Sequence, residues 1–241
     1  MKSRLFFAFL ACFLFVPFSH GKRKEKRSLV LLETSVGNIR VALFDYTPMH
    51  RDNFLRLAEE GFYDGTLFHR VIQEFMIQGG DPDSRRALPG QVLGEGGPGY
   101  TLPAEFCLPY LYHWRGALAA AREPDDVNPE MRSCGSQFYL VWGKKMSPAA
   151  LKKARETLSE KGIEMTSLMA NDYTMRGGTP HLDGTYTVFG EVVEGLDIVE
   201  KIQQEPTDDH DRPLLDVVVQ KVTVLQKSKD AVNNPTTFSK P

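Results

Sequence analysis

Cysteine is scarce in this chain of 241 residues, which contains only three. Three cysteines are too few for a disulfide scaffold, and none of them shows the paired CxxC or Cys/His spacing of a zinc site. No other metal-ligating or nucleophilic constellation stands out along the chain. The sequence therefore predicts a protein without a metal and without a cofactor.

An excess of charge of either sign is also lacking. Lysine and arginine total 29 against 31 aspartates and glutamates, so the formal net charge is -2. A nucleic-acid-binding domain usually carries a basic excess gathered on one face, so no nucleic-acid partner is predicted. The remaining composition, with 41% hydrophobic residues, 20 glycines and 15 prolines, lies near the globular average. It excludes collagen-like, disordered and membrane-bundle proteins.

A hydrophobic run long enough to span a bilayer is the third absence. The apolar run Leu5–Phe18 is shorter than the roughly 20 residues that a membrane span needs, and Pro17 lies near its end. Lys2 and Arg4 precede the run, and residues 19–21 are Ser-His-Gly. A basic start, an apolar stretch and small residues at the cleavage site are typical of a secretory signal peptide. We therefore expect cleavage after residue 21 and no stable membrane span.

The signal peptide predicts an exported, most simply periplasmic, protein. Lipid attachment at Cys12 is the alternative, but the bulky residues before it fit that poorly. Removal of residues 1–21 leaves a charged leader, residues 22–28, and only Cys107 and Cys134. An oxidising compartment allows such a pair to form a disulfide, and the sequence leaves open whether the two thiols lie close enough.

Short strands dominate the rest of the chain. The first two β-rich runs are joined by Thr34-Ser35-Val36-Gly37, which predicts a hairpin. Many short strands with glycine-rich turns favour a sandwich or a barrel. The predicted strands are Leu29–Glu33, Asn38–Phe44, Leu67–Ile72, Phe75–Gln78, Ala117–Ala121, Gln137–Val141, Tyr186–Phe189 and Leu215–Leu225.

Two helices are expected among these strands. Thr47 is placed to cap the first, Pro48 occupies its first turn, and Gly61 is placed to end it. Apolar residues at helical spacing between residues 196 and 202 indicate the second.

An extra helical segment interrupts the β-rich pattern. Within residues 143–178, Ser147-Pro148 precedes the Ala-, Leu-, Lys- and Glu-rich stretch Ala149–Lys161, and Gly162 follows it. We interpret residues 143–178 as an insertion. Residues 227–241 are polar without apolar periodicity and are expected to form a mobile tail.

The most informative motif spans Phe68 to Asp81. It reads Phe-His-Arg-Val-Ile-Gln-Glu-Phe-Met-Ile-Gln-Gly-Gly-Asp, which brings an arginine, an aromatic, a methionine and a glutamine together on two consecutive strands. Taken singly, each has an ordinary structural explanation: a core histidine or phenylalanine, a surface arginine, a glycine turn. Their order is far more specific than any one of them.

This motif resembles the signature of the cyclophilin-type peptidyl-prolyl isomerases. Three further segments agree with that family in the same order along the chain. They are Gly116–Ala121, which resembles the strand lining the family's peptide groove, Gly135–Tyr139, which resembles its Gly-Ser-Gln-Phe-Phe strand, and Leu182–Gly190, which resembles its Leu-Asp-Gly to Val-Phe-Gly stretch. The resemblance covers roughly residues 29–226, which we interpret as one isomerase domain.

The resemblance implies a mainly β fold, a closed eight-stranded antiparallel barrel with a helix over each open end. Closure removes exposed sheet edges. The strand and helix patterns described above agree with this fold, because they predict many strands with one early and one late helix. The insertion has no counterpart in compact family members, and it joins two groove segments. It is therefore expected beside the active face, as a flap or partner-binding surface, or simply as a tolerated loop.

The implied activity is rotation about the peptide bond that precedes proline. This rotation is slow because partial double-bond character must be lost, but no covalent bond is made or broken. A catalyst needs a pocket for the proline ring and a donor that favours the twisted amide. The resemblance assigns the donor role to Arg70, whose guanidinium is permanently charged. The implied partners are proline-containing peptides and unfolded or folding proteins, and a monomer is expected. A non-catalytic proline-peptide-binding chaperone on the same fold is the alternative.

The resemblance also supplies the other site residues. Phe75 and Gln78 join Arg70 as catalytic residues, with Gln78 expected to hold the arginine in position. The substrate-binding residues carried over are Met76, Ala121, Arg122, Gln137, Tyr139, His181, Leu182 and Tyr186. Some depart from the family's usual residues: Arg122 stands at an asparagine position, Tyr139 at a phenylalanine, His181 at a tryptophan and Tyr186 at a histidine. Gln73-Glu74 replaces a Pro-Gly turn.

Overall fold

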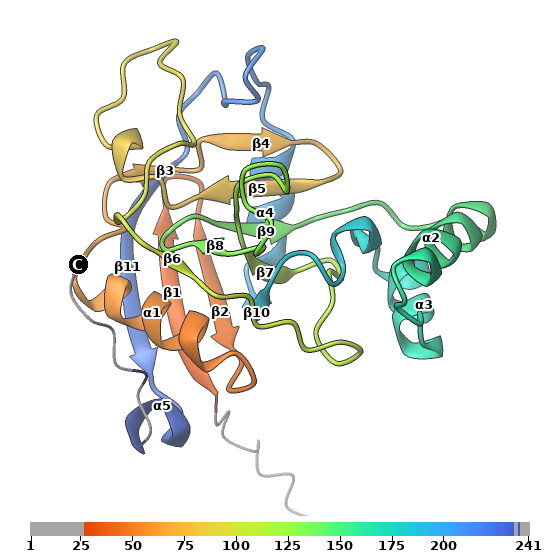
Figure 1. Ribbon diagram of the computed structural model, residues 1–241. Helices are drawn as coiled ribbons and strands as arrows, with labels where there is room; N and C mark the ends of the chain where they lie inside the picture. Colours follow the sequence, from red (N-terminus) through yellow and green to blue (C-terminus); the bar gives the residue numbers. More distant parts are fainter. Residues whose placement is uncertain (1–26, 234–235, 237–241) are drawn as a thin grey trace, which may run out of the picture.

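The protein, described by a computed structural model over residues 27–233 and residue 236, is built on one curled antiparallel sheet. The predicted signal peptide, most of the charged leader and the end of the chain lie outside the described residues. The sheet order is β3-β11-β1-β2-β10-β7-β9-β5-β4 (Figure 1). Its strands are β1 (Ser28–Thr34), β2 (Asn38–Leu43), β3 (Thr66–Leu67), β4 (Arg70–Ile72), β5 (Met76–Gly79), β7 (Ala117–Ala120), β9 (Phe138–Val141), β10 (Val188–Glu194) and β11 (Val218–Gln226).

The two edge strands of this sheet, β3 and β4, follow one another in the chain with only Phe68 and His69 between them. The first pairs with β11 and the second with β5. In effect the stretch from residue 66 to residue 72 is one bent strand that closes the sheet on itself. Counted this way the barrel has eight strands, which confirms the predicted fold.

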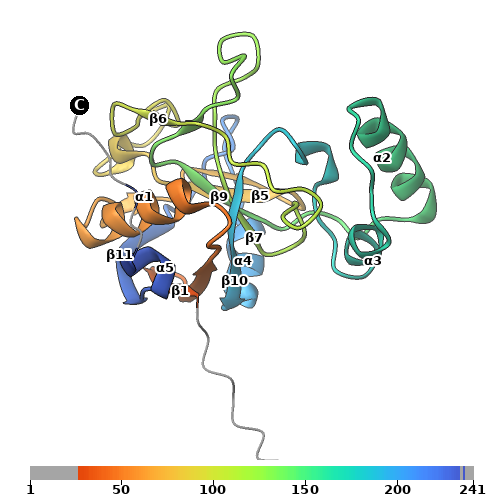
Figure 2. The same ribbon diagram turned by 60° about the horizontal axis from the view of Figure 1, so that its bottom comes forward.

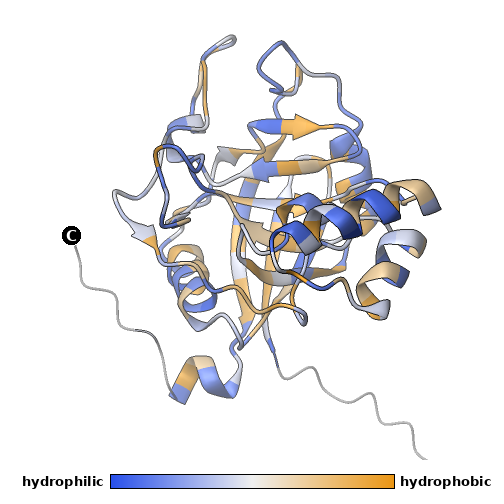
Figure 3. Ribbon diagram, turned by 45° about the vertical axis from the view of Figure 1, so that its right-hand side comes forward, coloured by the Kyte–Doolittle hydropathy of each residue, from blue (hydrophilic) through white to orange (hydrophobic). Residues whose placement is uncertain are grey.

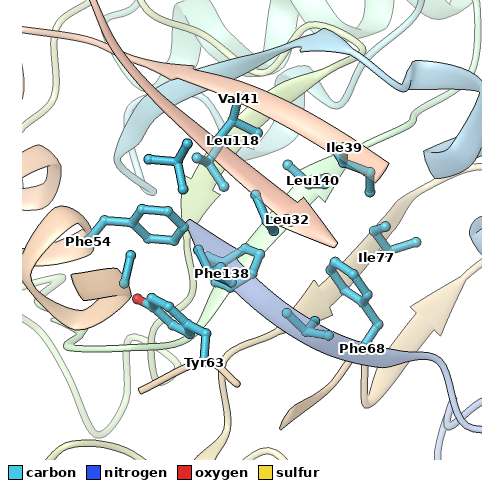
Figure 4. Close-up of a cluster of buried hydrophobic side chains, with 14 of the residues drawn as sticks. Leu32, Ile39, Val41, Phe54, Tyr63, Phe68, Ile77, Leu118, Phe138 and Leu140 are labelled. Carbon is cyan, nitrogen blue, oxygen red and sulfur yellow. The ribbon is translucent and has the colours of Figure 1, made fainter. Parts of the chain in front are cut away.

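The core fills the inside of the barrel. Phe138 lies at its centre, with ring centroids of Phe54, Tyr63 and Phe68 at 5.4, 5.6 and 6.0 Å, all edge-on (Figure 4). Edge-to-face packing of this kind adds to the stabilisation from burial alone. Aliphatic side chains from β1, β2, β5, β7 and β9 complete the cluster, among them Leu32, Ile39, Val41, Ile77, Leu118 and Leu140, all fully buried.

Two helices contribute to this core from opposite ends of β2. The first, α1 (Pro48–Glu59), starts just after β2 ends. The second, α4 (Leu196–Gln203), lies at the β1–β2 turn, where the Ile198 side chain lies directly against Gly37. Phe54 of α1 and Val199 and Ile202 of α4 are at most 2% exposed. Both helices were expected at these positions.

The start of α1 differs from the prediction that Thr47 caps it. The Thr47 side chain instead donates to the Phe44 carbonyl, and no side-chain cap forms there. The Glu105 carboxylate takes the role, accepting from the backbone N–H groups of Met49 and His50 at 3.1 and 2.9 Å. A carboxylate satisfies these free N–H groups and also interacts favourably with the positive end of the helix dipole.

The insertion contains the predicted helix and a second one. The predicted helix is α2 (Pro148–Glu160), capped by Ser147, whose hydroxyl accepts from the Ala150 N–H. The sequence did not predict α3 (Ser167–Met175). The two helices lie together beside the barrel in both views (Figures 1 and 2). Much of the visible face of α2 is hydrophilic (Figure 3), and Leu158 is its one buried residue.

Other elements too short for a periodic signal were also missed. These are the two-stranded sheet of β6 (Thr101–Leu102) and β8 (Ser133–Cys134), the 3-10 turns η1 (Pro82–Ser84) and η2 (Pro180–Leu182), and α5 (Lys229–Asn233). The last lies within the segment expected as a mobile tail, and its Ala231 is buried against the core. Cys107 and Cys134 are free thiols. Within the described part of the chain, no helix combines the length and apolar character required to cross a membrane.

Candidate active site

A pocket of about 140 Å³ gathers nine of the eleven predicted site residues. They come from strands β4, β5 and β9, from the end of β7, and from the segment around η2. The lining residues are Arg70, Phe75, Met76, Gln78, Ala121, Arg122, Tyr139, Leu182 and Tyr186. The other two, Gln137 and His181, lie at its border and contact its lining.

Strand alternation decides which side chains reach this pocket. On β9, Phe138 and Leu140 point into the barrel core while Tyr139 faces the pocket. On β5, Ile77 points into the core while Met76 and Gln78 line the pocket. The two-residue period of a strand therefore serves the core with one set of residues and the site with the other.

One wall of the pocket is apolar. Met76 and Tyr139 are 2% and 4% exposed, and Phe75, Leu182 and Tyr186 are half-buried around them. The Tyr139 and Tyr186 rings meet edge-on with centroids 6.0 Å apart. His181 stacks on Phe75 at 5.5 Å, and burial lowers the pKa of its imidazole, so the ring adds an uncharged aromatic surface behind the pocket.

Arg70 is the half-exposed cation of the pocket. Its Nε donates to Asp211 Oδ2 at 3.1 Å, and its terminal nitrogens have no hydrogen-bond partner among the described residues. Gln78 was expected to hold it, and this was wrong. Gln78 pairs with Arg70 across the two strands, but its amide donates to Gln137 at 2.8 Å. A carboxylate is a stronger acceptor for a guanidinium than an amide oxygen is.

Gln137 separates this pocket from a second, larger hollow. Its side-chain N–H₂ donates to the carbonyls of Gly94 and Gly96, both at 2.7 Å, while its oxygen accepts from Gln78. The second hollow, of about 630 Å³, is lined by the Gly-rich loop of residues 94–101 and shares Gln78, Ala121 and Arg122 with the first. The two hollows adjoin at these shared residues, and we call them together the groove.

Arg122, which stands at an asparagine position of the family, does not present a free charge to the groove. Its side chain is 3% exposed and its charge is balanced by Asp125 at 2.6 Å. Its Nε donates to the Thr185 carbonyl at 2.7 Å, and its guanidinium lies 4.5 Å from the Tyr186 ring centroid. Arg122 therefore positions the Tyr186 wall rather than presenting a free cation.

Sequence reasoning missed three residues around this site. Asp211, which holds Arg70, lies 141 residues away along the chain. His113 and Asp183 lie behind Tyr139 in a buried chain of hydrogen bonds. The only sequence signal for the second pair was the extra hydroxyl of Tyr139. Among the described residues no cluster of three or more His, Cys, Asp or Glu side chains is arranged to hold a metal ion.

Comparison with known proteins agrees with this geometry. Residues 29–224 match the family model of the cyclophilin type peptidyl-prolyl cis-trans isomerases. The chain belongs to this family. The match spans the whole barrel together with the insertion.

Bacterial relatives of this cyclophilin are also named as peptidyl-prolyl cis-trans isomerases. A Staphylococcus epidermidis protein named as a peptidyl-prolyl cis-trans isomerase is 34% identical over 196 residues, which are 81% of this chain and 90% of that protein. A Streptococcus pyogenes protein named as a bifunctional phosphatase/peptidyl-prolyl cis-trans isomerase is 38% identical over 199 residues. The match covers 81% of this chain but only 38% of the streptococcal protein.

Solved structures share the fold. A cyclophilin type peptidyl-prolyl cis-trans isomerase of Cryptosporidium parvum aligns with a TM-score of 0.61 at 24% identity, over 83% of this chain and 99% of that one. The same protein has been solved in the presence of the dipeptide Ala-Pro, with a TM-score of 0.59. At this identity the similarity establishes the barrel fold.

One departure of this cyclophilin from the family pattern has a visible structural consequence. Glu74 has φ of 58° at the turn before Phe75, where the sequence resemblance expects glycine. A non-glycine residue there costs roughly 1–2 kcal/mol. Its N–H donates to the Gln203 side chain at 2.7 Å, and its carboxylate pairs with Lys144 at the start of the insertion. These contacts hold the turn without the glycine.

Proposed function

We propose that this cyclophilin accelerates rotation about X-Pro bonds in exported proteins by a non-covalent mechanism, with Arg70 as the electrostatic catalyst. The observation that carries the proposal is the placement of a half-exposed guanidinium on the lining of a small pocket that has one apolar wall. The reaction needs at least these two features. The pocket holds the proline ring, and the guanidinium acts on the amide that precedes it.

The pocket has a suitable size and chemistry for a proline side chain. Its volume is about 140 Å³, and an engineered apolar cavity of about 150 Å³ accommodates benzene. A five-membered aliphatic ring therefore fits. Met76, Phe75, Leu182 and the two tyrosines offer apolar surface on several sides of the ring.

Arg70 supplies the preference for the twisted amide. The barrier to rotation, about 18–20 kcal/mol, comes from conjugation between the amide nitrogen and the carbonyl. On twisting, this conjugation is lost and the nitrogen gains a localised lone pair, which an N–H donor can stabilise. An interaction that is stronger in the twisted state than in the planar ground state raises the rate. Each tenfold in rate needs about 1.4 kcal/mol of such preference.

Asp211 orients this donor before the substrate arrives. Because it engages Nε from the side, the two terminal nitrogens are left to meet the peptide. Phe75 lines the same pocket as the arginine, and Gln78 and Gln137 link β5 to the glycine-rich loop through hydrogen bonds. The groove beyond Gln137 can receive residues that precede the proline.

A protease-coupled isomerisation assay on a short X-Pro peptide tests the mechanism. The wild type should accelerate isomerisation, Arg70→Ala should lose at least 100-fold in kcat/KM (about 2.7 kcal/mol), and Arg70→Lys should recover little because a point charge does not reproduce the guanidinium fork. Wild-type turnover no higher than that of Arg70→Ala rejects the enzyme mechanism. Retained peptide binding in that case supports the alternative, a non-catalytic proline-binding chaperone.

The export proposal has its own test. It rests on the basic start, the apolar run and the small residues at 19–21, all outside the described residues. Expression of the full chain followed by fractionation and N-terminal sequencing should give a mature protein that begins at Lys22 in the exported fraction. An unprocessed protein retained in the cytoplasm contradicts it. A lipid-modified Cys12 at the N-terminus supports lipoprotein processing instead.

A further inference from the structure

A buried chain of hydrogen bonds connects the insertion to the pocket. Tyr173 of α3 donates its hydroxyl to Asp183 Oδ2. Asp183 Oδ1 lies 2.9 Å from His113 Nδ1 and also accepts from the His113 backbone N–H at 2.9 Å. His113 Nε2 lies 2.9 Å from the hydroxyl of Tyr139, whose ring lines the pocket. All four side chains are at most 4% exposed.

The direction of these hydrogen bonds follows from the chemistry of the groups. The Asp183 carboxylate only accepts, so His113 carries its proton on Nδ1. Among the described residues Nε2 is the one acceptor that lies within hydrogen-bond distance of the Tyr139 hydroxyl, so the hydroxyl donates to Nε2. Burial raises the pKa of Tyr139 and of Tyr173 well above the ordinary value, so both hydroxyls remain protonated donors. The chain therefore has one consistent arrangement, which holds the Tyr139 ring at its tip.

Apolar packing makes the same connection. Leu158, Met165 and Met169 of the insertion are at most 2% exposed. They belong to one buried cluster with the pocket residues Met76 and Tyr139, and the half-buried Leu182 packs against that cluster. Lys161, at the end of α2, donates to the His181 carbonyl at 3.1 Å. The base of the insertion is pinned as well, because Gly178 bridges both Lys144 and Trp114.

We propose that the insertion is a fixed buttress of the pocket, and that Tyr173, Asp183 and His113 are positioning residues that set the orientation of the Tyr139 ring. The proposal rests on the proposed function, because it assigns Tyr139 to the wall that grips the proline. It replaces the sequence-based hypothesis of a flap. Because the apolar side chains of the insertion are buried in the same cluster as the pocket residues Met76 and Tyr139, the insertion supports the pocket from behind.

A double-mutant cycle on Tyr139→Phe and Tyr173→Phe tests the coupling. Both substitutions keep the ring and remove only a hydroxyl. Because each breaks the same chain once, we expect each to lower kcat/KM on an X-Pro peptide by about fivefold, and the double variant also by about fivefold rather than about 25-fold. The loss should lie mainly in KM, because the pocket wall binds the ring in both ground and transition states. If Tyr173→Phe fails to fold, the same cycle with His113→Gln in its place gives the answer.

Tyr112→Phe is the matched control. Tyr112 is equally buried in this cluster, and its hydroxyl donates to Asp172 of the same helix α3 at 2.6 Å. The Tyr112 ring also packs edge-on against the Tyr173 ring, and Tyr112→Phe keeps this packing while it removes a hydrogen bond that is not part of the Asp183 chain. The control should lower the melting temperature about as much as Tyr173→Phe does and leave kcat/KM unchanged. Additive losses in the cycle, or Tyr173→Phe and Tyr112→Phe with the same activity at equal stability, overturn the proposal.

The affinity of the same peptide, measured by calorimetry on each variant, separates this proposal from the proposed function. If the protein binds the peptide without turning it over, the isomerase mechanism fails. The buttress still predicts weaker binding for Tyr139→Phe and Tyr173→Phe, with no further loss in the double variant. If turnover is normal and neither kinetics nor affinity responds to Tyr173→Phe, the buttress alone fails.

Discussion

Substitution of Arg122 by alanine should weaken both the fold and the grip on substrate. The guanidinium donates to two backbone carbonyls, those of Thr185 and Glu123, at 2.7 and 2.9 Å, and it lies 4.5 Å from the Tyr186 ring. Hydrogen bonds from a charged donor contribute about 1.5 kcal/mol each at the low end, and the cation–π contact about 1 kcal/mol. The ion pair adds little because Asp125 is two-thirds exposed.

The expected loss in the free energy of unfolding is therefore about 4 kcal/mol. For a domain of this size a loss of 1 kcal/mol lowers the melting temperature by about 2–4 °C, so Arg122→Ala should melt about 8–16 °C below the wild type. Release of Tyr186 should also raise KM by about three- to tenfold, because an ordered wall side chain must be immobilised again on binding, at about 0.5–1.5 kcal/mol. The value of kcat should change little, since Arg70 is untouched.

Thermal unfolding and steady-state kinetics on the same preparations check both numbers. The melting temperature and KM of Arg122→Lys should lie between those of the wild type and Arg122→Ala, because lysine keeps the charge but not the planar guanidinium with its several N–H donors. Arg85→Ala is the matched control: Arg85 also donates to two carbonyls, those of Asp64 and Phe62, and lies over a ring, that of Phe62, outside the pocket lining. It should lose stability with KM unchanged. An Arg122→Ala protein with wild-type KM refutes the assignment of Arg122 to positioning Tyr186.

Two further predictions concern stability. Glu105→Ala removes the carboxylate that accepts from the N–H groups of Met49 and His50 and from the His50 ring; it should cost about 3 kcal/mol and lower the melting temperature by about 6–12 °C, whereas the exposed Glu164→Ala should leave it within about 2 °C. Burial lowers the pKa of His69 to about 4, whereas the imidazole in the unfolded chain has its ordinary pKa of about 6.5. Below pH 6.5 the unfolded chain therefore binds more protons than the folded one, and the free energy of unfolding decreases as the pH is lowered. The free energy of unfolding, measured with urea, should decrease by about 3 kcal/mol from pH 6.5 to pH 4. The His69→Gln protein should show a smaller decrease over the same range. An equal decrease in both proteins contradicts the assignment to His69.

The strands and helices that sequence reasoning located are those with a strong local signal. The hairpin of β1 and β2, the helix α1 with its proline start, α2 with its Ser-Pro start and the amphipathic α4 all lie where the pattern placed them. Elements of two to five residues, such as β6, β8 and α5, have no periodicity to detect and form only because their partners are already in place. The prediction that Thr47 caps α1 was wrong because the capping carboxylate, that of Glu105, comes from 56 residues further along the chain than Met49 and leaves no local signal.

The sequence by itself determined which side chains are available to the site and on which face of each strand they lie. The resemblance carried by the four motifs named the pocket residues, and the two-residue period of β9 placed Phe138 and Tyr139 on opposite faces. Tertiary structure decided what holds them. Asp211 rather than Gln78 orients Arg70. The Arg122 side chain is buried and forms an ion pair with Asp125. Tyr139 is connected by hydrogen bonds through His113 to a helix of the insertion. Such contacts depend on which distant groups come within about 3 Å once the barrel closes, and no local pattern encodes that distance.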